Sequence, residues 1–493
     1  MAKYDKNGYI TELEKDEVFV FGSNGHGAHF GGAAATAVHK FGAKMGQAEG
    51  LQGQSYAINT MDGYEEMVAQ IKRFLKFAKE HPELTFLVTE IGCGIAGYSP
   101  KQVAPHFKNH TNNVVLPKTF ETKKLNEKVD KYTSKARGML MGLAIGDALG
   151  APVQFGNSSD AIRMNLDYIR HMHDNHVLPK GVWTDDTSMA LCIADSLLEC
   201  GGYDSYDIMN KYLDWEAYGY RSYFDFGYDE GGQTANSLSN YRRDPIVPKD
   251  AEKEWNAGNG AIMRLAPIVI AGKHDAKADS PEERDHIIEL ARLSCRETHD
   301  SYMAIAVTEA FATLLALCYT YKDTASAIEH CTCWLSRNNE EERNCENEIH
   351  DAISRAIQSK DGEEFRDLGG YILDAFAIAV WGLLHFKSFK EGMIAVIGLG
   401  GDTDTNGAIY GQLAGAYYGF ESIPKEWRDD VYLSEEIIDI ADRLSSMNEC
   451  PILRTRFEDN EFFEDITDKK KTAKKSDDPK SIKEILKKMR GKL

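Results

Sequence analysis

The sequence predicts two folded domains, an α/β domain followed by a nearly all-helical one. Before residue 118, short apolar runs that end in glycine-rich turns alternate with a helical pattern, and after residue 135 helical periodicity dominates. A charged segment separates the two regions. We therefore expect domains at residues 1–118 and 136–468, a charged linker at 119–135 and a basic tail at 469–493.

In the first domain, residues 18–21 and 86–89 are candidate strands because they are short, apolar and rich in β-branched or aromatic side chains. Residues 64–80 between them have the periodicity of an amphipathic helix. In the second domain we expect helices that include residues 189–199, 302–319, 371–386 and 435–446, and we find no convincing strand.

Composition limits the class of protein. The 493 residues suit two to four domains, and 42% apolar with 27% charged residues excludes wholesale disorder. No run of about 18 apolar residues is present, so we expect no contact with a membrane. The first residues carry charges where a secretory signal needs an apolar stretch, and the nine cysteines lack framework spacing. We therefore expect a cytoplasmic protein with reduced thiols.

The charge balance argues against a general nucleic-acid binder. Lys and Arg minus Asp and Glu is 57 − 77 = −20, a charge that repels phosphates. The exception is the tail at 469–493, where 11 basic and 3 acidic residues give +8 and apolar residues recur at helical spacing. Direct contact with nucleic acid is therefore expected only through this tail, which can form a short amphipathic helix.

Glycine-rich loops follow both candidate strands, at residues 22–32 and 92–97. Backbone N–H groups in such loops, at the start of a helix, cradle phosphate groups. Two loops in one domain favour a diphosphate held from both sides, with turn geometry alone as the bland alternative. A Rossmann nucleotide site needs an acidic residue about 20 positions beyond its loop. Glu49 has that spacing but lies among glycines, so we favour this reading less.

The segments Phe21-Gly22-Ser23-Asn24, Gly31-Gly32-Ala33 and Gly92-Cys93-Gly94-Ile95-Ala96-Gly97 resemble the two ligand loops of a macro-like domain. The resemblance covers about residues 17–117 and implies a three-layer α/β/α fold that accommodates ADP-ribose. It does not imply catalysis, because many macrodomains only bind. The binding residues that it implies are Gly22, Asn24, Gly31, Gly32, Gly92, Gly94 and Gly97.

Two glycine stripes mark the second domain: every fourth residue is glycine from Gly138 to Gly150 and again from Gly407 to Gly419. Each glycine inside a helix costs about 1 kcal/mol relative to alanine, so the stripes need a compensating reason. A smooth glycine face lets a second backbone approach closely. We therefore expect the two helices to pack against each other and to bring acidic residues at their ends to one cleft.

Those acidic residues fall in two motifs, Thr184-Asp185-Asp186 and Asp402-Thr403-Asp404-Thr405, each at the start of a helix. Alone, each carboxylate is explained as a helix cap or a favourable charge on the helix dipole. Together they form an all-oxygen ligand set without paired His or Cys, which suits Mg²⁺ or Mn²⁺. Two ions about 3.5 to 4 Å apart would orient a diol and lower the pKa of a water.

The second domain is identified as a member of the ADP-ribosylglycohydrolase family by GLAIGDALGAPVQFG, WTDDTSMAL, DFG, GNGAIMR, THD and GLGGDTDTNGAIYGQLAGAYYG, which occur in the family's order over about residues 135–443. The resemblance implies an orthogonal all-α bundle with a binuclear Mg²⁺ or Mn²⁺ centre that cleaves ADP-ribose from an acceptor. It implies Asp147 as a support for the site and Gly258, Asn259, Gly260 and His299 as substrate-binding residues. The metal ligands that it implies are Thr184, Asp185, Asp186, Asp402, Asp404 and Thr405.

One position departs from the family. Gln154 stands where many members have a substrate-side glutamate, and Gln cannot act as a base. Asp225, in the Asp225-Phe226-Gly227 stretch, is then the carboxylate we nominate for proton transfer. Asp186 and Asp404 are the other two expected catalytic residues. We expect a metal-dependent hydrolase of ADP-ribosylated protein, with arginine the favoured acceptor. The alternatives are a non-catalytic ADP-ribose reader, or a first domain that itself removes ADP-ribose from nucleic acid.

Overall fold

The computed structural model describes residues 3–4, 10–93, 96–98, 100–107, 110–111, 113–120, 131–155, 170–174, 177–247, 257–273, 280–320, 324–332, 335 and 339–457. Two compact units emerge, Met1–Lys128 and Val129–Leu493. Their boundary falls inside the expected linker, although residues 131–135 of that linker already belong to the first helix of the second unit. Gly94 and the basic tail lie outside the described residues.

The first unit is built on a five-stranded sheet in the order β4-β5-β3-β6-β7, in which only β4 runs antiparallel to its neighbour. Both predicted strands and the predicted helix are confirmed, whereas β5 was not predicted. The elements are β1 (Lys3–Tyr4), β2 (Ile10–Glu12), β3 (Glu17–Ser23), α1 (Gly32–Phe41), β4 (Gly50–Gln52), β5 (Ser55–Asn59), α2 (Tyr64–Glu80), β6 (Thr85–Val88), α3 (Pro100–Val103), η1 (Ala104–Phe107), β7 (Val114–Val115) and η2 (Lys118–Phe120).

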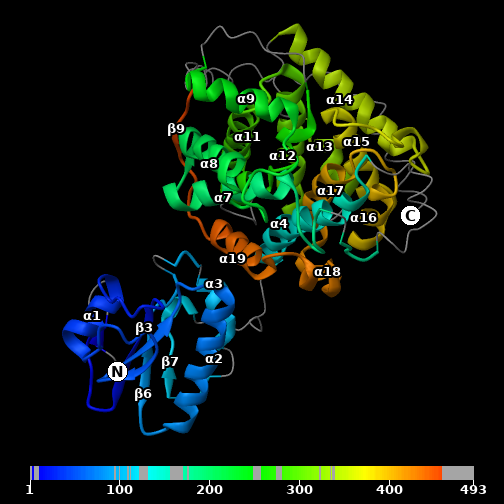
Figure 1. Ribbon diagram of the computed structural model, residues 1–493. Coiled ribbons are helices and arrows are strands. Elements are labelled where there is room, and N and C mark those ends of the chain that lie inside the picture. The colour runs from blue at the N-terminus through cyan, green and yellow to red at the C-terminus, as the bar shows by residue number, and fades with distance from the viewer. Residues whose placement is uncertain are drawn as a thin grey trace. The chain divides into compact units, whose positions relative to one another are not determined.

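The sheet is buried on both faces, which is why its strands read as continuous apolar runs. Val18 and Val20 of β3 pack in the core beneath α2, while the alternate residues Phe19 and Phe21 pack in the core beneath α1. Helices α1 and α2 accordingly cover opposite sides of the sheet (Figure 1). This unit is therefore a three-layer α/β/α arrangement.

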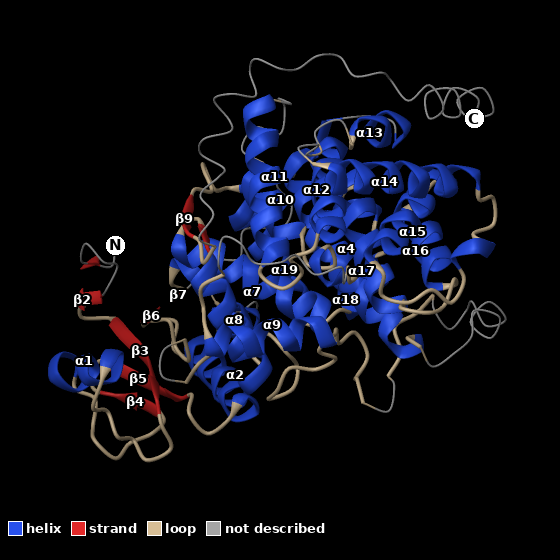
Figure 2. Ribbon diagram, turned by 90° about the horizontal axis from the view of Figure 1, so that it is seen from above, coloured by secondary structure: helices blue, strands red, loops and turns tan. Residues whose placement is uncertain are grey.

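The second unit is almost entirely helical, and Figure 2 shows its few strand residues against the helices. All four predicted helices are present. The elements are α4 (Lys131–Gly150), η3 (Ala151–Val153), α7 (Asp185–Cys200), β8 (Tyr203–Asp204), α8 (Ser205–Tyr218), α9 (Gly232–Arg243), η4 (Asn259–Ala261), α10 (Ala266–Gly272), α11 (Pro281–Arg296), α12 (Tyr302–Thr320), α13 (Thr324–His330), α14 (Glu340–Gln358), η5 (Glu363–Phe365), α15 (Ile372–His385), α16 (Phe389–Ile397), α17 (Thr403–Tyr418), η6 (Phe420–Ser422), α18 (Lys425–Asp430), α19 (Ser434–Ser445) and β9 (Ile452–Arg454).

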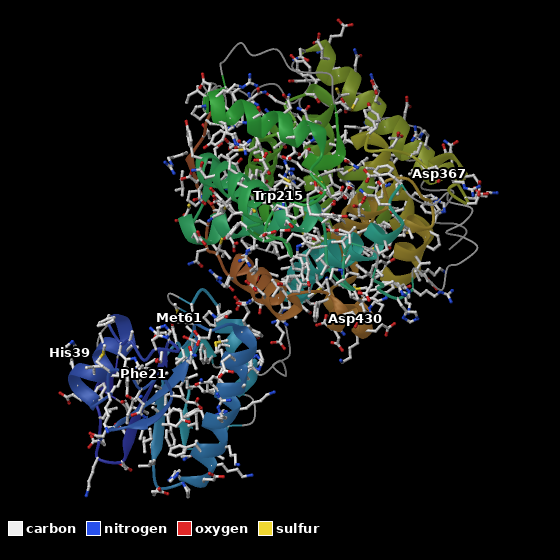
Figure 3. All side chains as sticks on the ribbon, viewed as in Figure 1. Phe21, His39, Met61, Trp215, Asp367 and Asp430 are labelled. Atoms are coloured by element: carbon white, nitrogen blue, oxygen red, sulfur yellow. The ribbon has the colours of Figure 1, made fainter. Side chains whose placement is uncertain are left out.

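The core of each unit is made by large side chains without solvent exposure. Trp215 in the helical unit and Phe21 in the sheet unit are both completely buried, and both are labelled in Figure 3. Among the described residues, no helix combines the length and the apolar character needed to traverse a bilayer.

The two glycine stripes form the predicted contact between α4 and α17. A Cβ atom on Gly138 would lie 2.5 Å from the Gly415 carbonyl oxygen, and one on Gly146 would collide with the Gly407 carbonyl. The relation is reciprocal, because a Cβ on Gly411 would collide with the Gly142 carbonyl. Side chains of any size are therefore excluded from this interface, and the two backbones touch.

Replacement of Gly411 by alanine tests this contact. Gly411→Ala gains about 1 kcal/mol of helix propensity. It also forces the two backbones apart, at a cost of about 1 to 3 kcal/mol or more. We expect a lower thermal unfolding midpoint. Gly369→Ala is the control, since a Cβ there meets no atom within 4 Å and the backbone is not left-handed. Equal midpoints for the two variants would refute the tight contact.

Candidate functional site

The contact between the glycine helices positions the acidic residues at their ends. Gly150, the last residue of α4, lies against Thr403, the first residue of α17, and its carbonyl accepts a hydrogen bond of 2.9 Å from Thr403 Oγ1. Asp402 is the residue before α17, and Asp404 lies inside its first turn. The last turn of α4 carries Asp147, so these carboxylates meet at one end of the helix pair.

Three carboxylates converge at this end. Asp147, Asp186 and Asp404 are completely buried, and each offers an oxygen within 4.8 Å of the other two. Asp186 comes from the first turn of α7, so three helices contribute. The two predicted acidic motifs therefore share one site, and Asp147, predicted only as a support, belongs to its centre.

The three carboxylates differ in their hydrogen bonds. Asp147 accepts bonds from the backbone N–H groups of Thr184 (2.9 Å) and Thr187 (3.0 Å) and from both threonine hydroxyls (2.9 and 2.6 Å). Asp186 Oδ1 and Asp404 Oδ2, in contrast, are buried and have no hydrogen-bond partner. Buried carboxylate oxygens without partners are costly unless a cation or a proton compensates them. These two oxygens are therefore the natural ligand positions.

Burial and mutual repulsion raise the pKa values of this cluster. The pKa of Asp147 rises to about 6, chiefly because its carboxyl is desolvated, while the threonine hydrogen bonds oppose the shift. The pKa values of Asp185, Asp186 and Asp404 are raised well above the ordinary range, first by burial and then by neighbouring carboxylates. A bound cation would reverse these shifts by favouring the ionised forms.

The six predicted metal ligands are all buried around this cluster: Thr184, Asp185, Asp186, Asp402, Asp404 and Thr405. Asp402 is held by a residue that belongs to neither acidic motif, because its Oδ2 accepts a hydrogen bond of 2.7 Å from Asn259 Nδ2. The donor set is hydroxyl and carboxylate oxygen, as Mg²⁺ and Mn²⁺ prefer. The residues present thus fit a divalent cation.

The loop of Gly258, Asn259 and Gly260 lies beside the cluster, and the His299 ring packs against it. The Asn259 N–H donates a hydrogen bond of 2.9 Å to the Gly370 carbonyl, which fixes the loop. A Cβ on Gly258 would lie 3.0 Å from His299 Nε2, and one on Gly260 would lie 2.8 Å from Cε1. Both glycines are therefore needed for the histidine ring to pack on this loop. The four predicted substrate-side residues of this region come together.

The side chain of the nominated base, Asp225, is exposed, and so is that of Asp229. Of the two, Asp229 is the one whose charge raises the pKa values of the buried Asp185 and Asp404. Asp229 is accessible to solvent and interacts with the Gln154 side chain and the Asp404 carboxyl. Its φ of 67° and that of Phe155, 44°, are left-handed conformations unusual for residues other than glycine. The sequence contains a signal for Asp229, since Asp229-Glu230-Gly231 repeats the pattern of Asp225-Phe226-Gly227.

The glycine loops of the first unit lie against each other. A Cβ on Gly22 would be 3.5 Å from the Gly92 backbone nitrogen, so the ends of β3 and β6 meet there. Gly31 and Gly32 begin α1, whose first turn has no side-chain cap. Gly97 is left-handed and exposed. The start of α1 therefore leaves backbone N–H groups without a side-chain partner, close in sequence to the first glycine loop.

Asn24 has a different role from the predicted ligand contact. Its Oδ1 accepts hydrogen bonds from the backbone N–H groups of His26 (3.1 Å) and Ala28 (3.0 Å), so the side chain shapes the loop itself. Glu49, the acidic residue that a Rossmann site would require, forms an ion pair of 2.7 Å with Arg73. Its position before the antiparallel strand β4 is not that of a ribose-binding residue after a parallel strand.

Known proteins share the helical unit. Residues 128–451 match the ADP-ribosylglycohydrolase family. The chain is 28% identical to ADP-ribosylarginine hydrolase Tri1 of Pseudomonas putida (strain GB-1), over 66% of this chain and 82% of the relative. It is 27% identical to ADP-ribosylhydrolase ARH3 of Bos taurus, over 62% of this chain and 90% of the relative.

A solved structure agrees with these matches. The chain of an ADP-ribosylglycohydrolase-related protein complex superimposes with a TM-score of 0.51 and 34% identity, covering 65% of this chain and all of that one. The match to the family spans well over half of the sequence and contains every residue of the carboxylate cluster. The chain therefore belongs to the ADP-ribosylglycohydrolase family, enzymes that hydrolyse ADP-ribose linkages.

Proposed function

We propose that the chain is a metal-dependent hydrolase that removes ADP-ribose from modified arginine side chains of proteins, and that its first unit binds ADP-ribose. The observation that carries the catalytic half is the pair of buried oxygens, Asp186 Oδ1 and Asp404 Oδ2, that have no partner and lie beside Asp147. Carboxylates are placed in this way to bind a cation.

The proposed ligands are Thr184, Asp185, Asp186, Asp402, Asp404 and Thr405, with two Mg²⁺ ions, or Mn²⁺ in their place. When bound, such ions hold ribose hydroxyl groups and polarise the linkage at C1″. Asp147 would not need to be a ligand, because four hydrogen bonds already saturate it. Its role is to orient Thr184 and Thr187 at the start of α7.

Proton transfer is proposed for Asp229. Its accessible carboxylate lies beside Asp404, and the Gln154 amide is its hydrogen-bonding neighbour. The amide can donate to one carboxylate oxygen and leave the other free to accept the proton of the attacking water. The water oxygen then joins C1″, and the bond from C1″ to the acceptor nitrogen breaks as that nitrogen gains the proton that Asp229 took from the water. Gln154 thus orients the Asp229 carboxylate.

Arginine is favoured as the acceptor for two reasons. Relatives from Pseudomonas putida and Serratia proteamaculans are named ADP-ribosylarginine hydrolases, and both match most of their length. In addition, a guanidinium group carries positive charge, and Asp229 presents an accessible carboxylate next to the buried cluster. The attraction between them would draw an arginine acceptor to the site.

For the first unit, the proposal rests on the paired loops after β3 and β6 and on the uncapped start of α1. A diphosphate would lie between these loops, with backbone N–H groups as donors. Phe30, which is 83% exposed next to Gly31, offers a face on which an adenine can stack. A binding unit of this kind would hold either the product or a second ADP-ribose mark.

The catalytic proposal is tested on a protein ADP-ribosylated at arginine, with Mg²⁺ and with a chelator. We expect free ADP-ribose only with the metal. Asp229→Asn should lower kcat about 100-fold or more because the proton acceptor is lost. Asp225→Asn is the matched control and should stay near the wild-type rate. Equal rates for the two variants would exclude Asp229 as the base, and binding without release from arginine or serine would favour the reader function.

The metal proposal predicts how stability depends on pH. Raised pKa values mean that the folded, metal-free protein keeps these carboxyls protonated while the unfolded chain ionises them. The free energy of unfolding should therefore fall as pH rises above about 4. By about pH 6 the ionisation of Asp147 alone should lower it by about 3 kcal/mol. We expect chelator-treated protein to melt at a lower temperature at pH 8 than at pH 5.5, and Mg²⁺ to restore it. In Asp404→Asn, both the drop in melting temperature between pH 5.5 and pH 8 and the restoration by Mg²⁺ should become smaller. If neither becomes smaller, the metal site is contradicted.

The binding proposal predicts two ADP-ribose molecules per full-length chain in calorimetry, one for each unit. Gly31→Glu places a carboxylate at the start of α1, where it would repel the diphosphate, and the stoichiometry should fall to one. Gly31→Ala is the control, because a Cβ at this position meets no atom within 4 Å. A single site in the wild-type chain would contradict ADP-ribose binding by the first unit.

A further inference from the structure

Arg264 is a fully buried cation with unusual partners. Among the described residues no carboxylate pairs with it. Its guanidinium instead lies 5.3 Å from the centre of the Tyr212 ring, contacts Met189 Sδ at 3.7 Å and donates from Nη2 to Thr298 Oγ1. Burial of an arginine in this way is costly, and no structural ion pair explains it.

The hydrogen bonds around Thr298 have only one consistent direction. A guanidinium donates and cannot accept, so Thr298 Oγ1 is the acceptor from Arg264. The same oxygen lies 2.7 Å from His299 Nδ1. If Nδ1 carried a proton, the hydroxyl hydrogen would have no acceptor among the described residues. The hydroxyl therefore donates to Nδ1, and the ring proton lies on Nε2.

The Nε2 atom lies against the loop of Gly258 and Gly260. His299 is only 3% exposed, and within the described part of the chain Nε2 makes no hydrogen bond. The nitrogen lies over Gly258, in the loop whose Asn259 holds Asp402. The unpartnered donor thus lies against the loop that contacts Asp402, where an oxygen of a ligand can accept from it.

We propose that Arg264 and Thr298 are positioning residues that fix His299 as the Nε2–H tautomer, so that it donates to a phosphate or ribose oxygen of the ADP-ribose group. The ligand in this statement rests on the proposed function. The tautomer does not, because the hydrogen bonds that set it are present without ligand. Arg264 acts through Thr298 and does not touch the substrate.

Thr298→Val is the test of the relay, since valine has the shape of threonine without its hydroxyl. Valine removes the acceptor of the buried Arg264, so we expect a lower thermal unfolding midpoint; the backbone stays anchored because the Thr298 carbonyl accepts from Gln233 Nε2 (3.0 Å) and Ser237 Oγ (2.8 Å). In ¹⁵N-histidine-labelled, ligand-free full-length protein, we expect a neutral Nε2–H tautomer for His299. This form should persist in Thr298→Ser and be lost in Thr298→Val. A wild-type Nδ1–H tautomer, or no change in Thr298→Val, would overturn the relay.

Kinetics tests the donor. A Gln amide can place an N–H near the Nε2 position, whereas the shorter Asn cannot reach it. Relative to wild type, His299→Asn and Thr298→Val should raise KM for the ADP-ribosylated substrate about 10-fold with little change in kcat, while Thr298→Ser stays near the wild-type KM and His299→Gln raises KM less than His299→Asn does. Equal KM values for His299→Gln and His299→Asn would overturn the donor role. Absence of turnover in the wild type would refute the proposed function, yet leave the tautomer measurable.

Discussion

Contact between two bare backbones sets the geometry of the helical unit. Successive turns of α4 and α17 present glycine to each other, and the carbonyl of one helix occupies the place of a side chain on the other. Packing this close is intolerant of error, because interiors are filled to the density of organic crystals. The contact ends at Gly150 and Thr403. A shift of the helices there would separate Asp147 from Asp404 and dissolve the site.

The buried carboxylates near that contact differ in their hydrogen-bond partners, and we infer that they therefore differ in their roles. Asp147 has a full shell of donors and acts as a rigid anchor, whereas Asp186 and Asp404 each keep a buried oxygen unsatisfied. The first turns of α7 and α17 point their N-termini at this region, which lowers part of the cost of so much negative charge. A bound cation would relieve the remaining cost, as the proposed function requires.

Much of this arrangement could be predicted because the periodic spacing of apolar residues and of glycines can be observed in the sequence itself. The periodicity of residues 64–80 matches α2, and the four-residue glycine spacing predicted the helix contact. Asp229, which we propose as the base in place of Asp225, was missed because two Asp-x-Gly patterns lie four residues apart, and their spacing does not show which one lies near the buried carboxylates. Strand β5 was missed because its ends, Ser55 and Asn59, are polar and leave only three apolar residues between them, although the sheet buries the whole strand.

The partners in the glycine contact are far apart in the chain: Thr403 and Gly150 are separated by 253 positions. Native structure that depends on such distant pairing forms slowly, since a long loop must close first. During synthesis α4 therefore emerges long before the helix that covers its glycine face. That face stays unprotected until the ribosome has passed residue 418, so any truncated chain lacking α17 would be a target for chaperones and proteases.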